Sequence, residues 1–314
     1  MSEPVIDLQD LRKDYGRTHA LVDLDLQVHR GEVFGFLGPN GAGKTTTIRI
    51  LMDLIRPSGG QARVLGLDTR RDGVAIRRRV GYLPGDFVVD GRQSAHELLT
   101  YLGHLRGGVP EARFATLARR LDLDLRPPIR ALSKGNRQKV GLVQAFMHEP
   151  ELLILDEPTS GLDPFLQAEF TAMAREAVGR GAAVFMSSHV MSEVQKAADR
   201  VGIVRQGVLV AVQDVAALLA STARQVEIVF AAPVDAARFA AVDGLSDLQV
   251  DGAVLRCRLE GSADSLVKVA AAHTVLSVTS EEPALEEFFF RRYSQGAGAA
   301  ASGATAPFER GRRP

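Results

Sequence analysis

The chain has 314 residues, of which 46% are hydrophobic and 24% are charged, and 38 basic residues balance 38 acidic ones. This length predicts about two domains, and this composition is ordinary for a globular chain with a sizeable core. A net charge of zero gives no electrostatic support for a polyanion-binding role, so no nucleic-acid partner is expected. The single cysteine, Cys257, excludes an internal disulfide framework and a Cys-cluster metal site; we interpret it as a half-buried small apolar residue.

No apolar stretch of the sequence approaches the roughly 20 residues that cross a bilayer as a helix. The first residues, Met1 to Val5, lack the basic and apolar regions of a signal peptide. We therefore expect a cytoplasmic chain, unless another molecule tethers it to a membrane.

The N-terminal region predicts two antiparallel strands. Residues 5–11 and 20–28 alternate apolar and polar side chains, which is the period of strands with one face in water. The stretch Lys13 to Gly16 between them predicts a turn. It carries a lone aromatic residue, Tyr15, which on its own would be interpreted as packing on the end of the sheet.

A glycine-rich loop follows the apolar run 33–37 and precedes a predicted helix at 46–55. It fits the pattern G-x-x-x-x-G-K-[ST] and consists of Gly38, Pro39, Asn40, Gly41, Ala42, Gly43, Lys44, Thr45 and Thr46. Glycines let successive backbone N–H groups converge on an anion, and the N-terminus of the following helix favours phosphate. Lys44 would reach the β- and γ-phosphates, and the Thr45 hydroxyl would ligate Mg²⁺. A plain glycine-rich turn is the alternative, and the full match with both flanks favours nucleoside triphosphate binding.

Between this loop and residue 150 the sequence predicts a strand, a basic run and several helices. The strand covers 61–67, the arginines 77–79 are interpreted as a solvated helix face, and a short strand covers 80–84. Two helices between Ser94 and Leu121 form a local subdomain. The apolar face of the first is predicted to hold Leu98, Leu99, Leu102 and Leu105. A further helix spans 136–147.

Residues 152–155 form a continuous apolar run, the pattern of a central strand buried on both faces, and the run ends in Asp156 and Glu157. An acid at such a strand end suits Mg²⁺ coordination beside a phosphate loop. Glu157 points to the other side and suits a carboxylate that orients or deprotonates a water molecule. A helix at 165–179, a strand at 182–187, a helix at 193–199 and two short strands complete an α/β domain that ends near residue 215.

A smaller second domain is predicted over residues 222–293. The strand 225–230, the helix 234–241, a hairpin over 248–258, the helix 263–272 and the strand 274–280 follow the order β-α-β-β-α-β of a ferredoxin-like α+β unit. A last helix starts at Pro283, and its residues Phe288 to Phe290 are interpreted as core packing or subunit contact. The glycine- and alanine-rich stretch 295–314 predicts a disordered tail.

The order and spacing of these motifs resemble the ATP-binding cassette (ABC) ATPases over residues 5–215. The resemblance implies an α/β fold with a P-loop ABC ATPase core, in which a mixed sheet carries helices beside an antiparallel β subdomain and a helical subdomain at about 86–150. It implies that Tyr15 stacks on adenine and that His189, after the strand 182–187, holds the γ-phosphate and the attacking water. Ser133 and Gly135, in a serine–glycine signature, would contact ATP bound by the opposite subunit.

Three positions depart from the family's pattern. Lys134 and Asn136 replace the usual glycine and glutamine of the signature, and Gly85 stands where a glutamine usually reaches Mg²⁺ and the water. Gly85 has no side chain for that role, which passes to water or Asp86 or is absent.

One cassette supplies each half of a shared site once, so the resemblance implies a homodimer that closes on ATP and opens after hydrolysis. We expect the ATPase subunit of an exporter of the ABC-2 type, which includes drug-resistance pumps, docked on separate membrane-spanning subunits through residues near 86–106. Residues 81–86 and 282–293 support this expectation. The alternatives are an importer ATPase with a regulatory C-terminal domain and a soluble ABC ATPase of DNA repair or translation. The expected location is peripheral, on the inner face of the cell membrane.

Overall fold

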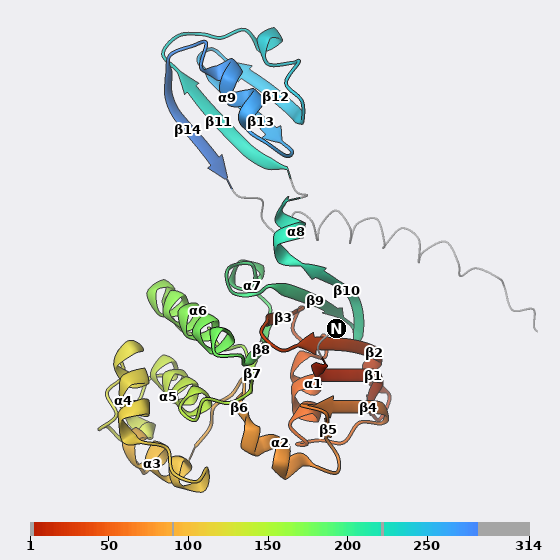
Figure 1. Cartoon of the computed structure of the whole chain (residues 1–314), viewed down its shortest axis with the longest axis vertical. Helices are drawn as coiled ribbons and strands as arrows, with labels where there is room; N and C mark the ends of the chain where they lie inside the picture. Colours follow the sequence, from red (N-terminus) through yellow and green to blue (C-terminus); the bar gives the residue numbers. More distant parts are fainter. Residues whose placement is uncertain (1–2, 90, 221–222, 282–314) are drawn as a thin grey trace, which may run out of the picture. The chain divides into compact units, whose positions relative to one another are not determined.

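The computed structural model describes residues 3–89, 91–220 and 223–281, and it divides the chain into two compact units, Met1–Val215 and Ala216–Pro314 (Figure 1). The predicted helix from Pro283, with Phe288 to Phe290, and the predicted tail 295–314 lie outside the described residues. Within the described residues, no helix is long and apolar enough to cross a membrane.

The first unit contains two sheets and the helices around them. Its strands are β1 (Pro4–Tyr15), β2 (Thr18–His29), β3 (Val33–Leu37), β4 (Gly59–Val64), β5 (Leu67–Asp68), β6 (Val80–Leu83), β7 (Leu152–Asp156), β8 (Ala183–Ser188), β9 (Arg200–Arg205) and β10 (Val208–Asp214). Its helices are α1 (Lys44–Leu51), α2 (Gly73–Arg79), α3 (Ala95–Leu105), α4 (Glu111–Arg120), α5 (Lys134–Phe146), α6 (Pro164–Gly179) and α7 (Met191–Ala197). The helix α8 (Val215–Ala220) follows β10.

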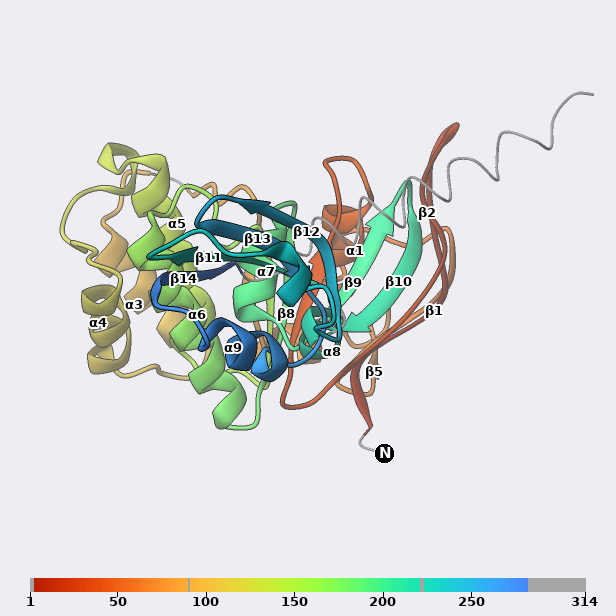
Figure 2. The same ribbon diagram turned by 90° about the horizontal axis from the view of Figure 1, so that it is seen from above.

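The larger sheet has the order β10-β9-β3-β8-β7-β6, and its strands β9, β3, β8, β7 and β6 run parallel. The smaller sheet, β2-β1-β4-β5, is antiparallel. Helix α1 contacts β7 of the first sheet and both β2 and β4 of the second, so it lies between the sheets (Figures 1 and 2). The strands β3 and β7 are buried along their whole length because both of their faces are covered. Because β3, β8 and β7 run parallel, their carboxyl ends lie at the same edge of the sheet, beside the start of α1.

The N-terminal strands confirm the predicted alternation, but the predicted turn at Lys13 to Gly16 is wrong. Leu24, Leu26 and Val28 are buried, whereas β1 runs on to Tyr15, which pairs with Thr18. The chain reverses at Gly16, whose φ of 60° lies in the left-handed region that favours glycine.

The interpretation of the arginines 77–79 as a solvated face holds for Arg78 alone. Arg79 donates from Nε to Glu151 Oε1 at 2.6 Å, and Arg77 donates to the carbonyl of Met52 at 3.1 Å. Both arginines are half-buried. The run therefore ties the end of α2 to its neighbours instead of only facing water.

The helical subdomain is formed by α3, α4 and α5. Leu98 and Leu99 are buried as predicted, but Leu105 is 66% exposed. Leu105 is the last residue of α3, and the chain turns away at Gly107 and Gly108, whose φ values are 88° and 99°. Leu102 is half-buried, so the apolar face of α3 ends within its last turn, before Leu105.

Over residues 223–281, the second unit consists of a four-stranded antiparallel sheet and one α-helix. Its elements are β11 (Arg224–Phe230), β12 (Leu245–Asp251), β13 (Val254–Leu259), α9 (Asp264–Ala270) and β14 (Val275–Glu281), and the strand order is β12-β13-β11-β14. The predicted hairpin is present, and Cys257 is buried. The predicted helix 234–241 is wrong: a single 3-10 turn, Ala236–Arg238, replaces it, and the Asp235 side chain accepts from the N–H of Ala237.

A half-buried histidine, His148, lies beside the end of α3. Arg106, which follows α3, donates to His148 Nε2 at 2.7 Å and also reaches the carbonyl of Arg77 at 3.3 Å. Burial, and secondly the charge of Arg106, lowers the pKa of His148 to about 4. His148 is therefore neutral at physiological pH and accepts the hydrogen bond from Arg106.

His148→Gln is expected to flatten the pH dependence of stability. The unfolded state takes up a proton on His148 near pH 6.5, whereas the folded state resists protonation down to about 4, so the unfolding free energy of the natural protein falls across this window as the pH drops. Between pH 7 and pH 5 this loss amounts to about 2 kcal/mol. Urea denaturation at both pH values measures it, with His19→Gln at an exposed histidine as the control. Equal pH dependence in natural protein and His148→Gln would contradict the assignment.

Candidate functional site

The phosphate loop lies between β3 and α1, as its sequence predicts. Gly38 is packed so closely that an added Cβ would lie 2.3 Å from the carbonyl oxygen of Val204, and Gly43 has a φ of 109°. Side chains at either position would clash or strain the backbone, which explains both glycines. The loop lines a hollow of about 200 Å³. The lining residues are Ala20, Pro39, Asn40, Gly41, Ala42, Gly43, Lys44, Thr45, Thr46 and Glu157.

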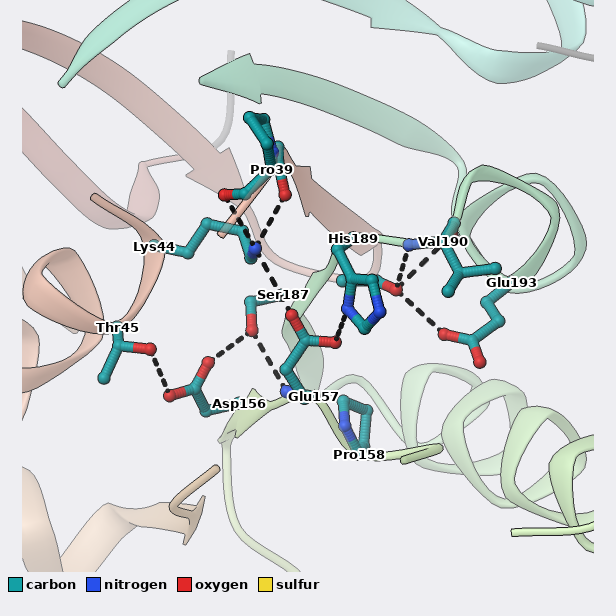
Figure 3. A network of polar contacts seen from close by, with 12 residues as sticks. Pro39, Lys44, Thr45, Asp156, Glu157, Pro158, Ser187, His189, Val190 and Glu193 are labelled. Atoms are coloured by element: carbon teal, nitrogen blue, oxygen red, sulfur yellow. Dashed lines mark hydrogen bonds and ion pairs between the residues drawn. The ribbon is translucent and has the colours of Figure 1, made fainter. Parts of the chain in front are cut away.

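Lys44 is 6% exposed, and its ammonium group is held inside the loop. It donates to the carbonyl of Gly38 at 2.7 Å, and its Nζ lies 3.3 Å from Glu157 Oε1 (Figure 3). A buried cation requires such partners because desolvation is costly. Lys44 is thus paired with backbone carbonyls and a carboxylate at the place where it is predicted to meet phosphates.

The two acids at the end of β7 point to different partners (Figure 3). Asp156 is 1% exposed; its Oδ2 accepts from the Thr45 hydroxyl at 2.8 Å and its Oδ1 accepts from the Ser187 hydroxyl at 2.5 Å. Glu157 turns toward Lys44 and His189, whose Nδ1 lies 2.8 Å from Glu157 Oε2. The structure therefore brings together Lys44, Thr45, Asp156, Glu157 and His189, from three elements far apart in sequence.

The oxygens of Thr45 and Asp156 fit a Mg²⁺ ion. The ion prefers hard oxygen donors and is held by one or two carboxylates together with substrate phosphates. Here a hydroxyl and a buried carboxylate are 2.8 Å apart beside the phosphate loop. The described residues contain no cluster of three or more His, Cys, Asp or Glu side chains that could hold a metal ion.

Ser187, the next-to-last residue of β8, is a site residue that the sequence analysis missed. It is fully buried, donates to Asp156 Oδ1 and accepts from the backbone N–H of Glu157 at 3.0 Å. One hydroxyl thus fixes both acids. The sequence offered one signal, a serine at the end of an apolar strand. The structure adds that this strand pairs with the strand carrying the acids.

Gly85 lies against the same carboxylate. A Cβ added to Gly85 would be 3.0 Å from Asp156 Oδ2, so the glycine leaves no room for a side chain without a shift of Asp156. Asp86 is exposed. On the strand before this loop, burial and secondly the charge of Asp156 raise the pKa of Tyr82 to about 12, so its phenol stays neutral.

Tyr15 is 48% exposed and is not among the residues that line the hollow. The Lys13 ammonium lies 5.0 Å from the centre of its ring, so one face of the aromatic already carries a cation.

Ser133 and Gly135 belong to α5, outside the hollow. Ser133 caps the helix and accepts from the N–H of Asn136 at 3.1 Å, and it is exposed. A Cβ at Gly135 would lie 2.8 Å from the carbonyl oxygen of Gly161, so this glycine is required by close packing. Further along α5, Gln138 donates to the carbonyl of Glu157 at 3.1 Å. Helix α5 thus contacts the residue after β7 through Gln138, while Ser133 is exposed.

Comparison with known proteins matches residues 21–160 to the ABC transporter family. The daunorubicin resistance ATP-binding protein DrrA3 of Streptomyces coeruleorubidus is 41% identical over 217 residues, which cover 67% of this chain and 68% of the relative. The Nod factor export ATP-binding protein I of Cupriavidus pinatubonensis is 38% identical and covers 61% of each chain. A bacterial ABC transporter cassette solved as a dimer superposes with a TM-score of 0.61 at 21% identity, over 67% of this chain and 98% of that one.

Ser187→Ala is expected to lower both stability and ATP turnover. The substitution leaves the buried Asp156 without one donor and the Glu157 N–H without its acceptor, at a cost of about 1–3 kcal/mol in unfolding free energy. Urea denaturation measures that cost, and the Mg²⁺ dependence of ATP hydrolysis measures the effect on Asp156.

The matched control is Ser188→Ala. Ser188 is also fully buried, but it bonds Glu193 at 2.8 Å and the N–H of Val190. It should lose stability without a changed Mg²⁺ dependence. A similar change in both variants would show that Ser187 has no special part in holding Asp156.

Proposed function

This chain belongs to the ATP-binding proteins of ABC transporters and is an ATPase, and we propose that it powers an exporter by driving separate membrane-spanning subunits. The observation that carries the proposal is the cluster of Lys44, Thr45, Asp156, Glu157 and His189 around the phosphate loop. Relatives named for drug resistance and for Nod factor export support the direction of transport.

ATP binding at this site replaces contacts that the protein now makes with itself. The phosphates would accept hydrogen bonds from the loop N–H groups and from the Lys44 ammonium. In this structure the ammonium contacts the Gly38 carbonyl and Glu157 instead. Mg²⁺, when bound by Thr45 and Asp156, would neutralise charge on the phosphates. Tyr15 would stack on the adenine.

Glu157 and His189 would then position the water molecule that attacks the γ-phosphate. Their 2.8 Å contact uses Nδ1 of the imidazole, which leaves Nε2 for the phosphate. Glu157 would accept a proton from the water, and His189 would hold its carboxylate in place.

A second copy completes the site. Ser133 is exposed at the N-terminus of α5, and neither Ser133 nor Gly135 lines the hollow. Cassettes with this fold have been solved as dimers. In a twofold homodimer, each α5 N-terminus would offer its free N–H groups to the γ-phosphate held by the other subunit.

The membrane subunits would dock on the helical subdomain near residues 86–106. This region exposes three large apolar side chains: Val88 is 84% exposed, Tyr101 57% and Leu105 66%. Exposed apolar residues gathered on one region are typical of a protein interface. Such docking would place the ATPase peripherally on the inner face of the cell membrane. The cargo would be chosen by the membrane subunits.

Glu157→Gln is expected to bind ATP and trap an ATP-bound dimer. The amide keeps the shape of the side chain but accepts no proton, so turnover should fall by at least about 100-fold. Analytical ultracentrifugation with and without ATP measures the dimer, and phosphate release measures turnover.

The control for this dimer is Glu157→Gln combined with Lys44→Ala, which removes the cation from the phosphate loop and should show no increase in dimer when ATP is added. Normal hydrolysis by Glu157→Gln would rule out its role as the base.

Purification from membranes in mild detergent is expected to retain a multi-spanning partner protein. Tyr101→Ser combined with Leu105→Gln should release that partner and leave ATP binding intact, because both side chains are exposed. Val74→Gln, at a 63% exposed position on α2, is the matched control. Recovery of only soluble or nucleic-acid partners would contradict transport and favour a different ABC ATPase class.

A further inference from the structure

The two edges of the C-terminal sheet differ in how they are protected. Unpaired edge strands are templates for pairing with another strand, and proteins usually protect them with charges, bulges or proline. One edge, β12, carries Asp247 and Asp251. Its register shifts between Ser246 and Gln249, where Asp247 has a φ of 51°. This edge is irregular and acidic, and so resists pairing.

The opposite edge of the described sheet, β14, lacks charges and proline along most of its length, and its register with β11 shifts once, between Ser277 and Val275. Residues Val275 to Ser280 are uncharged, contain neither glycine nor proline, and are all exposed. Its apolar side chains are exposed to solvent: Val275 is 36% exposed, Leu276 66% and Val278 56%. Such a strand is expected to be covered in the working protein.

We infer that β14 pairs with β14 of a second copy of this chain, antiparallel about a twofold axis, to form one continuous eight-stranded sheet from two C-terminal sheets of four strands each. An axis through Val278 lies within the stretch Ser277 to Glu281, which pairs regularly with β11. It places Ser277 opposite Thr279, and the residues from Val275 to Ser280 carry no charge. No like charges face each other in this register.

The position of Val278 on the sheet supports this register. Val278 lies beside Ile228, which is 1% exposed and belongs to the core face, whereas Thr279 lies beside Glu227 on the other face. Two Val278 side chains that meet at the axis would extend the apolar layer of Ile228 from one copy into the next. The edge thus fits a second copy of itself in both charge and apolar character.

The proposed function requires two copies of the chain, but it does not require contact between their β14 strands. Dimerisation of the first units would raise the local concentration of a second β14. Pairing of β14 itself needs no nucleotide, so it can be tested separately from the ATP-driven dimer.

Disulfide cross-linking of full-length Val278→Cys tests the pairing. Residues opposite each other in antiparallel strands have Cα atoms about 4.5–5.5 Å apart, which suits a disulfide. The natural Cys257 is buried and should not react. We expect about tenfold more cross-linked dimer than from Ser246→Cys, at an exposed position on the protected edge. Lys44→Ala should leave this cross-linking unchanged.

A second measurement uses charge. Val278→Lys should weaken nucleotide-free self-association about tenfold in ultracentrifugation, and Val267→Lys should leave it unchanged. Val267 lies on α9 and is also 56% exposed, so the pair differs only in location. The ATP-driven dimer of Glu157→Gln should survive Val278→Lys.

Cross-linking of Val278→Cys no higher than that of Ser246→Cys would overturn the proposal. Cross-linking that appears only when the chain ends at Glu281 would also overturn it, because the chain's own C-terminal residues would then cover β14.

Discussion

The left-handed backbone at Glu157 is the constraint on which the site depends. Its φ of 50° is uncommon for a residue other than glycine and costs of the order of 1–3 kcal/mol. This conformation ends β7 abruptly and separates two neighbouring carboxylates, so that Asp156 meets Thr45 while Glu157 meets Lys44 and His189. In the proposed function, metal ligation and water activation would therefore come from consecutive residues without competing for one position.

Hydrogen bonds to both the N–H and the carbonyl of Glu157 hold its backbone in this conformation. The Ser187 hydroxyl accepts from its N–H, and Gln138 donates to its carbonyl. Gln138 lies on the same helix as Ser133, less than two turns away. In the proposed dimer, a contact of the partner subunit with Ser133 would therefore act on the helix whose Gln138 bonds the Glu157 carbonyl. The close packing of Gly135 on Gly161 fixes the same helix to the loop after Glu157.

Sequence patterns predicted the elements that carry the site because the local signals agree there: a buried strand, a glycine-rich loop and a helix start follow one another within β3 and α1. The errors arise where tertiary contacts decide. Ser187 looks like part of an apolar strand, and only its register beside Asp156 reveals its role. Leu105 fits the helical period, but the chain turns away at Gly107. Asp235 caps a short turn in place of the helix predicted at 234–241.

The ion pair of Lys44 and Glu157 links the phosphate loop to the carboxylate that we propose as the base. Both side chains are largely buried, at 6% and 20% exposure, so neither charge is well screened by water. While Lys44 lies 3.3 Å from Glu157, the two opposite charges stabilise each other. Phosphates that draw Lys44 away remove this stabilisation and leave His189 as the remaining partner of Glu157. In the proposed function, nucleotide binding would thus transfer one cation from the Glu157 carboxylate to the phosphates.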